Sequence, residues 1–354
     1  VSSAFRIVSV LAIPAGVGLS VLGGSALLMP YPAQYTDDML QGIYRAHGDQ
    51  VGYVNNDLRC YCTKKKVPGK VAIITGGGTG HLPLFLGYVG ENLLDGCAVG
   101  SVFQSPSAEQ IYEISKAVEA GAGVLYLYGN YTGDIMNFDM AAEMCDMDDI
   151  KTASIVGADD VNSNADVNAR RGVAGIFFMY KCAGAKAAQM GTLDEVLAAA
   201  QKAKDNTRTV GFALTPCVIP EIGHANFTLG ENEMAMGMGI HGEPGVWNGP
   251  VKTADELAEE SLNTLLGDMP VAAGEEVALL INGLGATSAE ELYILSNSVS
   301  KRLEDKGISI YRTFVGEFAT SMEMAGASIS IMKLDDETRA MLDMPVSTPF
   351  YCQK

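Results

Sequence analysis

The chain has 354 residues, which is long enough for two domains of ~150 residues each. Its 48% hydrophobic composition and 40 glycines indicate a globular protein with many tight turns and argue against a disordered or fibrous one. The 42 acidic residues outnumber the 24 basic ones, giving a net charge of −18. Such a surface repels phosphate backbones and anionic lipids, so we expect neither nucleic acid nor a membrane as a partner.

Two features of the chain bear on its location. The seven cysteines are scattered, with neither CxxC spacing nor nearby histidines, which predicts reduced thiols, no bound metal and a cytoplasmic protein. Cys60 and Cys62 are two residues apart, a spacing that seldom meets disulfide geometry. The apolar stretch 8–29 is long enough for a membrane span or a signal peptide. We favour an extension outside the fold for residues 1–30 over a true anchor.

In chain order, an amphipathic helix is expected over 36–47. A buried strand over 70–75 (KVAIIT) then leads into a glycine-rich turn and His81, and the apolar run 84–89 predicts a following helix. Such a strand-turn-helix elbow would let a ligand approach its glycine backbone and would attract anions or polar oxygens to the helix N-terminus. A turn that needs glycine for packing alone is the alternative. His81 favours a site, because open α/β sheets bind ligands beyond the ends of their strands.

A second group of elements carries another candidate. Ser107 and Gln110 form a capping box for a helix to about residue 118, and a strand over 123–128 follows. This strand delivers Asp134, which is either a helix cap or, beside His81, a candidate base with a pKa near ~4. A strand over 152–156, a loop or surface pair Arg170 and Arg171, a helix over 192–204 and a polar boundary at 204–208 complete this half.

The second half begins with a strand over 209–214 and an irregular region over 215–249. Loops of that length inside a compact domain are usually functional. Glycines flank His241 within this region, which lets the imidazole approach a ligand closely, although a structural histidine is the alternative. Capping boxes at Thr253 and Ser288 predict helices around a strand over 277–282, and later strands are expected over 308–315 and 328–334.

The remaining chemistry is limited to a few side chains. The chain has no Walker A pattern, and its glycine run lacks the G-x-G-x-x-G spacing, so we expect it to bind no nucleotide. It does offer His81, Asp134 and His241 on loops at strand ends. A neutral imidazole can add to a ketone, and a carboxylate can take a proton from a hydroxyl.

Several long motifs follow one another along the chain, namely GGGTGH, FQSPSAEQ, NYTGDIMNF, FTLGENEMAMGMGIHGEPG, NGLGATSAEELY and MKLDDETRAMLDMPVSTP. In these motifs and their order, the sequence from about residue 33 to the C-terminus resembles the K subunit of dihydroxyacetone kinase. The resemblance implies that His241 binds a short ketose covalently as a hemiaminal, and that His81 and Asp134 act at the hydroxyl that attacks phosphorus. The further candidate substrate-binding residues in these motifs are Gly78, Thr79, Gly80 and Ser105.

The resemblance also implies an architecture and partners. We expect two α/β domains, the first spanning 31–206 with a returning segment 319–354, and the second spanning 207–318 and carrying the His241 loop. The first sheet should resemble a mannose-class phosphotransferase IIA-like domain. We further expect a homodimer that acts with an L subunit, on which ADP or ATP is bound with Mg, and in phosphotransferase-linked members an M subunit also takes part.

Three departures from the family pattern concern the substrate. Leu82 follows His81 where the family often has glutamate, Gly129 stands where a lysine is frequent, and Gln104 replaces a common threonine. They leave open a different ketose, such as a tetrulose like erythrulose. A non-catalytic coactivator that senses the ketose is the competing class. The presence of His81 and Asp134 beside His241 favours catalysis, because sensing through a hemiaminal needs only His241.

Overall fold

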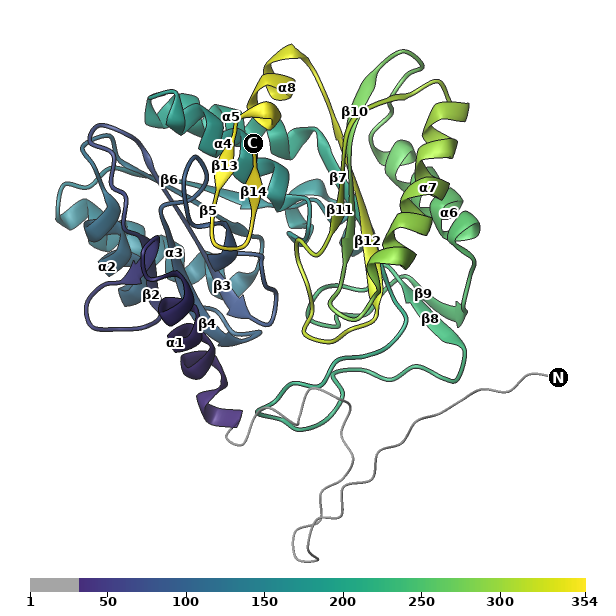
Figure 1. The fold of residues 1–354 in the computed structure, drawn as a ribbon, viewed down its shortest axis with the longest axis horizontal. Helices are drawn as coiled ribbons and strands as arrows, with labels where there is room; N and C mark the ends of the chain where they lie inside the picture. The colour runs from purple at the N-terminus through teal and green to yellow at the C-terminus, as the bar shows by residue number, and fades with distance from the viewer. Residues whose placement is uncertain (1–31) are drawn as a thin grey trace, which may run out of the picture.

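The computed structural model describes residues 32–354, so the predicted N-terminal extension and its apolar stretch 8–29 lie outside the described residues. Two six-stranded sheets stand side by side and form two α/β units (Figure 1). The two predicted α/β units are therefore confirmed, and the expected likeness of the first sheet to a IIA-like domain stays a prediction. Across the described range, no helix combines the length and apolar character needed to cross a bilayer.

The first sheet has the strand order β1-β2-β4-β3-β5-β6. Strands β3, β4, β5 and β6 run parallel, whereas β1 and β2 form an antiparallel edge. Parallel strands end at one edge of the sheet, which brings the loops after β3, β4 and β5 together. The bounds are β1 (Val51–Tyr53), β2 (Cys60–Thr63), β3 (Ala72–Thr79), β4 (Gly96–Val102), β5 (Val124–Gly129) and β6 (Thr152–Gly157).

The second sheet has the order β11-β10-β12-β7-β8-β9 and is mostly antiparallel, with β10 and β11 as its parallel pair. Its predicted strands were correct to within a few residues. The irregular region 215–249 contains two further short strands, β8 and β9. The bounds are β7 (Thr207–Ala213), β8 (Glu233–Met236), β9 (Trp247–Pro250), β10 (Glu276–Gly283), β11 (Ser309–Gly316) and β12 (Gly326–Lys333).

Helices cover both faces of the first sheet and the outer face of the second (Figure 1). Helices α4 and α5 lie between the sheets, α2 and α3 cover the outer face of the first sheet, and α6 and α7 cover the second. The bounds are α1 (Tyr35–His47), α2 (Ala108–Val118), α3 (Thr132–Met147), α4 (Ile176–Ala188), α5 (Leu193–Asp205), α6 (Ala254–Asp268), α7 (Ala289–Asp305) and α8 (Asp336–Asp343), with 3-10 turns η2 (Pro32–Gln34), η3 (Leu86–Tyr88), η4 (Val161–Ser163) and η5 (Val167–Ala169).

The helix starts follow from local capping. The capping boxes predicted from the sequence are confirmed. In each one, the side chain of the first residue accepts a hydrogen bond from the backbone N–H three residues later, and the side chain of that later residue accepts one from the backbone N–H of the first. These interactions satisfy N–H groups that a helix leaves free at its N-terminus. The residues concerned are Ser107, Thr192, Thr253 and Ser288, and α8 adds Asp335.

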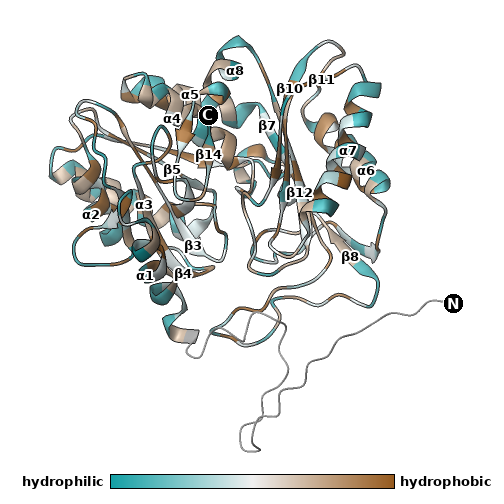
Figure 2. Cartoon of the chain, viewed as in Figure 1, coloured by the Kyte–Doolittle hydropathy of each residue, from teal (hydrophilic) through white to brown (hydrophobic). Residues whose placement is uncertain are grey.

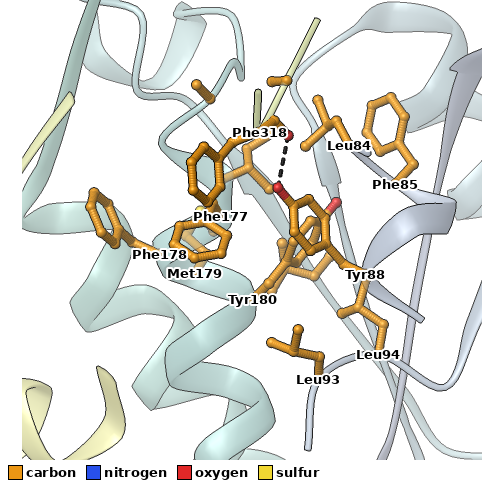
Figure 3. Packing of buried hydrophobic residues seen from close by; sticks show 14 of the residues in the cluster. Leu84, Phe85, Tyr88, Leu93, Leu94, Phe177, Phe178, Met179, Tyr180 and Phe318 are labelled. Atoms are coloured by element: carbon orange, nitrogen blue, oxygen red, sulfur yellow. Dashed lines mark hydrogen bonds between the residues drawn. The ribbon is translucent and has the colours of Figure 1, made fainter. Parts of the chain in front are cut away.

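One apolar core joins the two units. Phe177 of α4 lies between Tyr88 of the first unit and Phe318 of the second, and the Tyr88 hydroxyl donates a 2.8 Å hydrogen bond to the Phe318 carbonyl (Figure 3). Helix α4 is buried on nearly every side, as its largely apolar sequence requires, and the buried Lys181 in it donates a hydrogen bond to the Met344 carbonyl at 2.7 Å. Helices α6 and α7 instead alternate hydrophilic and hydrophobic residues, as expected at the surface (Figure 2). The shared core sets the two units close together.

The predicted helix after the glycines is wrong. Strand β3 continues through Gly76, Gly77 and Gly78, and only the short 3-10 turn η3 follows. The reason is packing: a Cβ on Gly77 would lie 2.3 Å from the ring of Phe85, and one on Gly78 would lie 2.6 Å from the backbone nitrogen of Gln104. The glycines therefore let other chain segments cross the strand, which is the alternative interpretation considered above.

The C-terminal segment divides differently from the predicted return at residue 319. Strand β12 (Gly326–Lys333) lies in the second sheet between β10 and β7. The later residues form α8 and the hairpin β13 (Val346–Ser347) and β14 (Cys352–Gln353), which packs on the first unit through a hydrogen bond between Glu91 N–H and Ser347 O at 2.8 Å. Strand β12 is apolar, and its place between β10 and β7 in the second sheet buries it, which a position in a C-terminal segment on the first unit would not do.

Candidate active site

His81 and His241 come from different units and meet at the boundary between them. His81 follows β3 of the first unit, and His241 lies between β8 and β9 of the second. Their ring centroids are 4.7 Å apart and the rings are perpendicular, at 87°. The His81 segment is bonded to the second unit, since Met322 N–H donates to Gly80 O at 2.7 Å and Thr320 N–H donates to His81 O at 3.2 Å. The pairing of the two histidines thus depends on the packing of the units.

Aromatic rings surround the two imidazoles. Phe103 stacks on His81 at 4.8 Å and 17°, and meets His241 edge-on at 5.2 Å. Tyr131 meets His241 edge-on from another side at 4.8 Å. Phe103 has a φ of 57°, a left-handed conformation that a bulky side chain rarely adopts. Such strain persists where the surroundings hold it, and here the missing Cβ of Gly78 lets the Phe103 backbone cross β3.

Glu243 orients His241. One carboxylate oxygen lies 2.9 Å from His241 Nδ1, and the other accepts the His241 backbone N–H at 2.9 Å. Burial opposes ionisation of Glu243, but the hydrogen bond from His241 and the charges of His241 and Arg171 outweigh it and lower the pKa of Glu243 to about 2. A carboxylate can only accept, so Nδ1 of His241 carries the hydrogen. In the neutral imidazole, Nε2 then keeps its lone pair free.

His81 is held as a neutral acceptor. It is 1% exposed, and its Nδ1 lies 2.8 Å from the Thr320 carbonyl, which fixes the hydrogen on Nδ1. Burial, together with the nearby His241, lowers the pKa of His81 to about 3. Its Nε2 is buried and has no hydrogen-bond partner within residues 32–354. A buried acceptor without a partner is costly, so this atom is suited to a hydroxyl of a bound molecule.

Asp134 lies in the first turn of α3 and is 5% exposed. Burial raises the pKa of Asp134 to about 6, against the lowering effects of the Ser105 hydroxyl and the His241 charge. The expected pKa near ~4 is therefore too low, because a strand-end position does not reveal burial. Its Oδ1 is buried without a partner in the described structure, and Tyr131 rather than Asp134 precedes the helix. Asp134 is thus available as a base and is no helix cap.

The other predicted substrate-binding residues lie in different surroundings. Ser105 packs on the start of α3, where a Cβ on Gly133 would be 2.7 Å from its hydroxyl oxygen. Thr79 turns toward α1, with its hydroxyl 3.3 Å from that of Thr36. Gly80, at a φ of 99°, lines a separate cleft of about 350 Å³ that contains none of His241, Asp134 and Ser105. The structure therefore brings Ser105 to the catalytic candidates and directs Thr79 elsewhere.

The three residues that depart from the family pattern lie in different places in the structure. Leu82 lines the same separate cleft as Gly80. At Gly129, a Cβ would lie 2.9 Å from the ring of Tyr131, so the glycine makes room for the ring that borders His241. Gln104 contributes the backbone that crosses Gly78. Of the three departures, Gly129 has the most direct effect on the wall of the site.

An ionic network lies behind His241 that was not predicted from the sequence. Arg170 and Arg171 lie in a loop, which is one of the two alternatives expected, but Arg170 is not at the surface: it is 3% exposed and binds Asp268 through two hydrogen bonds, of 2.6 and 2.8 Å. Arg171 binds Asp160 at 2.8 Å and lies 3.8 Å from Glu243. Glu243 stands in the same motif as His241 and could have been recognised, but Arg171 and its partners are too far apart in sequence to be paired.

Two further predictions concern cysteines and metals. All seven cysteines are free, as expected. In the part of the chain that the structure describes, no group of three or more His, Cys, Asp and Glu side chains has the arrangement of a metal site.

Comparison with known proteins identifies the family. Residues 41–350 match the Dak1 domain. The chain belongs to the Dak1 family. It is 44% identical over 316 residues to the dihydroxyacetone-binding subunit DhaK of a PTS-dependent dihydroxyacetone kinase from Listeria innocua, covering 89% of this chain and 96% of the relative. The resemblance stated from the sequence motifs is confirmed.

Two other Dak1 proteins differ in what their names describe. A D-erythrulose kinase from Mycolicibacterium smegmatis is 41% identical over 90% of this chain, and the match spans 55% of that enzyme. The solved structure of the dihydroxyacetone kinase operon co-activator DhaQ superposes with a TM-score of 0.82 at 32% identity, covering 87% of this chain and 96% of DhaQ. The Dak1 fold therefore occurs both in kinases and in a regulator.

Proposed function

We propose that this chain binds a short-chain ketose covalently on His241 and presents a ketose hydroxyl for phosphorylation by a nucleotide-carrying partner subunit. One observation carries the proposal: beside an imidazole whose hydrogen is held on Nδ1, His81 Nε2 and Asp134 Oδ1 are both buried and have no hydrogen-bond partner among the described residues. A small polyhydroxylated ketone supplies an electrophilic carbon for His241 and hydroxyls for the other two groups. Kinase relatives support a phosphotransferase with an alcohol acceptor.

The covalent step uses the orientation of His241. The Nε2 lone pair forms a bond to the carbonyl carbon while the π pair of the C=O bond moves to oxygen, which takes up a proton from solvent. The Nδ1 proton leaves to solvent through Glu243, which balances this uptake and leaves the imidazole without a buried positive charge. The neutral His81 accepts a hydrogen bond from a ketose hydroxyl through Nε2.

The phosphoryl step uses Asp134. The ketose hydroxyl oxygen forms a bond to the terminal phosphorus of the nucleotide, the bond from that phosphorus to the leaving nucleotide oxygen breaks, and the hydroxyl proton passes to Asp134. A pKa of about 6 keeps Asp134 largely ionised near pH 7 yet basic enough to take a proton, which suits a general base. The glycines of β3 are crossed by the Phe103 and Gln104 backbone, so we place the nucleotide, ADP or ATP with Mg, on an L subunit.

The proposal is tested with the purified chain in two stages. Intact mass measured with and without dihydroxyacetone should show an increase by one ketose, and calorimetry should show no ATP binding by the chain alone. Turnover should then require an L subunit, supplied with ATP or with a phosphotransferase-linked M subunit. A chain that forms no ketose adduct at millimolar concentrations, or that binds ATP tightly by itself, would overturn the assignment.

The substrate has a second candidate supported by an observation. The aromatic wall around His241 includes Tyr131 in the space that Gly129 leaves, and an erythrulose kinase is among the similar proteins. Erythrulose has one more hydroxymethyl carbon than dihydroxyacetone and the same ketone. Comparing adduct formation and turnover for the two ketoses decides between them.

A ketose-sensing coactivator is the second candidate function, and the close structural match to DhaQ favours it. Sensing needs the His241 adduct, whereas turnover also needs the Asp134 base. A chain that forms the adduct but gives no turnover with any L subunit would be assigned as a sensor. The expected homodimer and a cytoplasmic location, which suits seven free thiols, belong to the same proposal, and light scattering of the purified chain tests the dimer.

A further inference from the structure

We infer that Arg171 is a positioning residue for His241: through Glu243 it fixes the hydrogen of the imidazole on Nδ1 and so presents Nε2 to the ketose. The inference rests on the proposed function for its ketose readout. Arg171 itself is 15% exposed and contacts neither His241 nor any atom that would react. It acts through the carboxylate that lies between them.

The geometry forms a chain of charges across the unit boundary. Arg171 lies between β6 and α4 of the first unit, its Nε donates to Asp160 Oδ2 at 3.0 Å, and its Nη2 lies 2.8 Å from the same oxygen in an ion pair. The same guanidinium donates to Gly237 O at 3.1 Å and lies 3.8 Å from Glu243 Oε2, both in the His241 loop of the second unit. A planar guanidinium spreads its donors over a rigid fork and can face Asp160, Gly237 and Glu243 in separate directions, whereas the donors of an ammonium all lie on a single nitrogen.

The glycines of the His241 loop are explained by this chain of charges. A Cβ on Gly239 would lie 2.1 Å from Glu243 Oε2 and 2.6 Å from Arg171 Nη1, so only glycine leaves room for the pair. Gly242 has a φ of 84°, which lets the chain turn so that Glu243 folds back onto His241. The charge of Arg171 also helps keep Glu243 ionised. An ionised acceptor at Nδ1 selects the tautomer with the lone pair on Nε2.

The neighbouring Arg170 offers a matched control. It is a buried arginine that likewise joins the first unit to the second, through Asp268 at the end of α6, but it has no contact with Glu243. Arg171→Lys and Arg170→Lys therefore make the same chemical change at adjacent positions: each keeps the positive charge and removes the forked guanidinium group. Both should lower the thermal midpoint by a similar amount. Only Arg171→Lys should alter His241.

Two readouts separate positioning from stability. The first readout is the ketose concentration that gives half occupancy of His241, measured by intact mass. It should rise tenfold or more in Arg171→Lys, since a small misplacement of a reacting group can cost ~100-fold. In Arg170→Lys it should change less than about twofold. In ¹⁵N-histidine NMR spectra without ketose, the parent and Arg170→Lys should show His241 with its hydrogen on Nδ1. Arg171→Lys should show a mixture of tautomers.

Gly239→Ala provides an independent variant that removes no charge. Its added methyl should displace Glu243 from Nδ1, with the same mixed tautomer and weakened occupancy as Arg171→Lys. The inference is overturned if both arginine variants change occupancy equally, or if Arg171→Lys and Gly239→Ala retain the parent tautomer. If the parent forms no ketose adduct, the proposed function fails, whereas the tautomer measurement still decides whether Arg171 positions His241.

Discussion

His81 and His241 stand perpendicular to each other with ring centroids 4.7 Å apart, although 160 positions separate them in the sequence numbering (241 − 81 = 160). Each imidazole has its Nδ1 held by an oxygen, of Thr320 in one case and of Glu243 in the other. In the neutral form of each ring, Nε2 therefore carries no hydrogen and keeps its lone pair. The proposed division of labour is that one Nε2 bonds to carbon and the other accepts a hydroxyl hydrogen.

The first prediction concerns the covalent site. His241→Ala should abolish the mass increase on incubation with ketose, because the other imidazole of the site, His81, is assigned to accept a hydroxyl hydrogen through Nε2 and not to bond to the carbonyl carbon. His224→Ala is the control, since His224 is exposed and its Nδ1 contacts only the neighbouring Ala225 carbonyl, at 3.0 Å. It should keep the parent occupancy. An undiminished adduct in His241→Ala would place the bond elsewhere.

The second prediction separates turnover from binding. Asp134→Asn removes the base but keeps the size of the side chain, so ketose occupancy should stay within a few-fold of the parent while turnover with an L subunit falls on the order of 10²-fold. In the parent, turnover should decline as the pH falls through about 6, where Asp134 takes up a proton. A variant with parent turnover would exclude Asp134 as the base.

The third prediction uses the same pKa as a statement about stability. Because the pKa of Asp134 is raised on folding, from 3.8 to about 6, its contribution to stability is present in acid and lost as the pH rises through about 6. Asp134→Asn should therefore increase the free energy of unfolding at about pH 8, by up to about 3 kcal/mol, and change it little near pH 4. Thermal melts at the two pH values measure the difference. An equal effect at both would contradict the burial argument.

The fourth prediction concerns the neutral state of His81. A pKa lowered to about 3 means that His81 should not titrate in ¹⁵N-histidine spectra between about pH 8 and 5. A base with a depressed pKa also costs stability as the pH falls below its unfolded value of 6.5. His81→Leu should thus lose less stability on acidification than the parent. Titration of His81 near pH 6 would refute its assignment as a neutral acceptor.

The fifth prediction tests why β3 is glycine-rich. Gly78→Ala should lower stability by about 1–3 kcal/mol and weaken ketose occupancy, since its Cβ would meet the Phe103 and Gln104 backbone at 2.6–2.7 Å and displace the ring stacked on His81. Gly42→Ala in α1 is the control, because a Cβ there meets nothing within 4 Å. That change should stabilise the helix by up to about 1 kcal/mol. Urea denaturation of both variants gives the comparison.

The sequence by itself determined the elements and the chemical groups. Capping boxes such as that at Thr192 depend on residues three apart, and the strands depend on short runs of apolar side chains, so both could be predicted locally. His81 and Asp134 were evident because polar side chains after apolar strands mark the open end of an α/β sheet, and His241 because glycines flank it within a long irregular region. The motif resemblance also indicated the family that the comparison confirmed.

Only the tertiary structure decided how these groups work. Whether a glycine run binds a ligand or is crossed by another segment depends on Phe85 and Phe103, which approach β3 from outside the motif. The pKa of Asp134 depends on burial between elements, and the Arg171 contact with Glu243 joins residues of two different units. Such properties arise from desolvation and from distances between chain segments, which depend on how the two units pack and are not encoded by local sequence spacing.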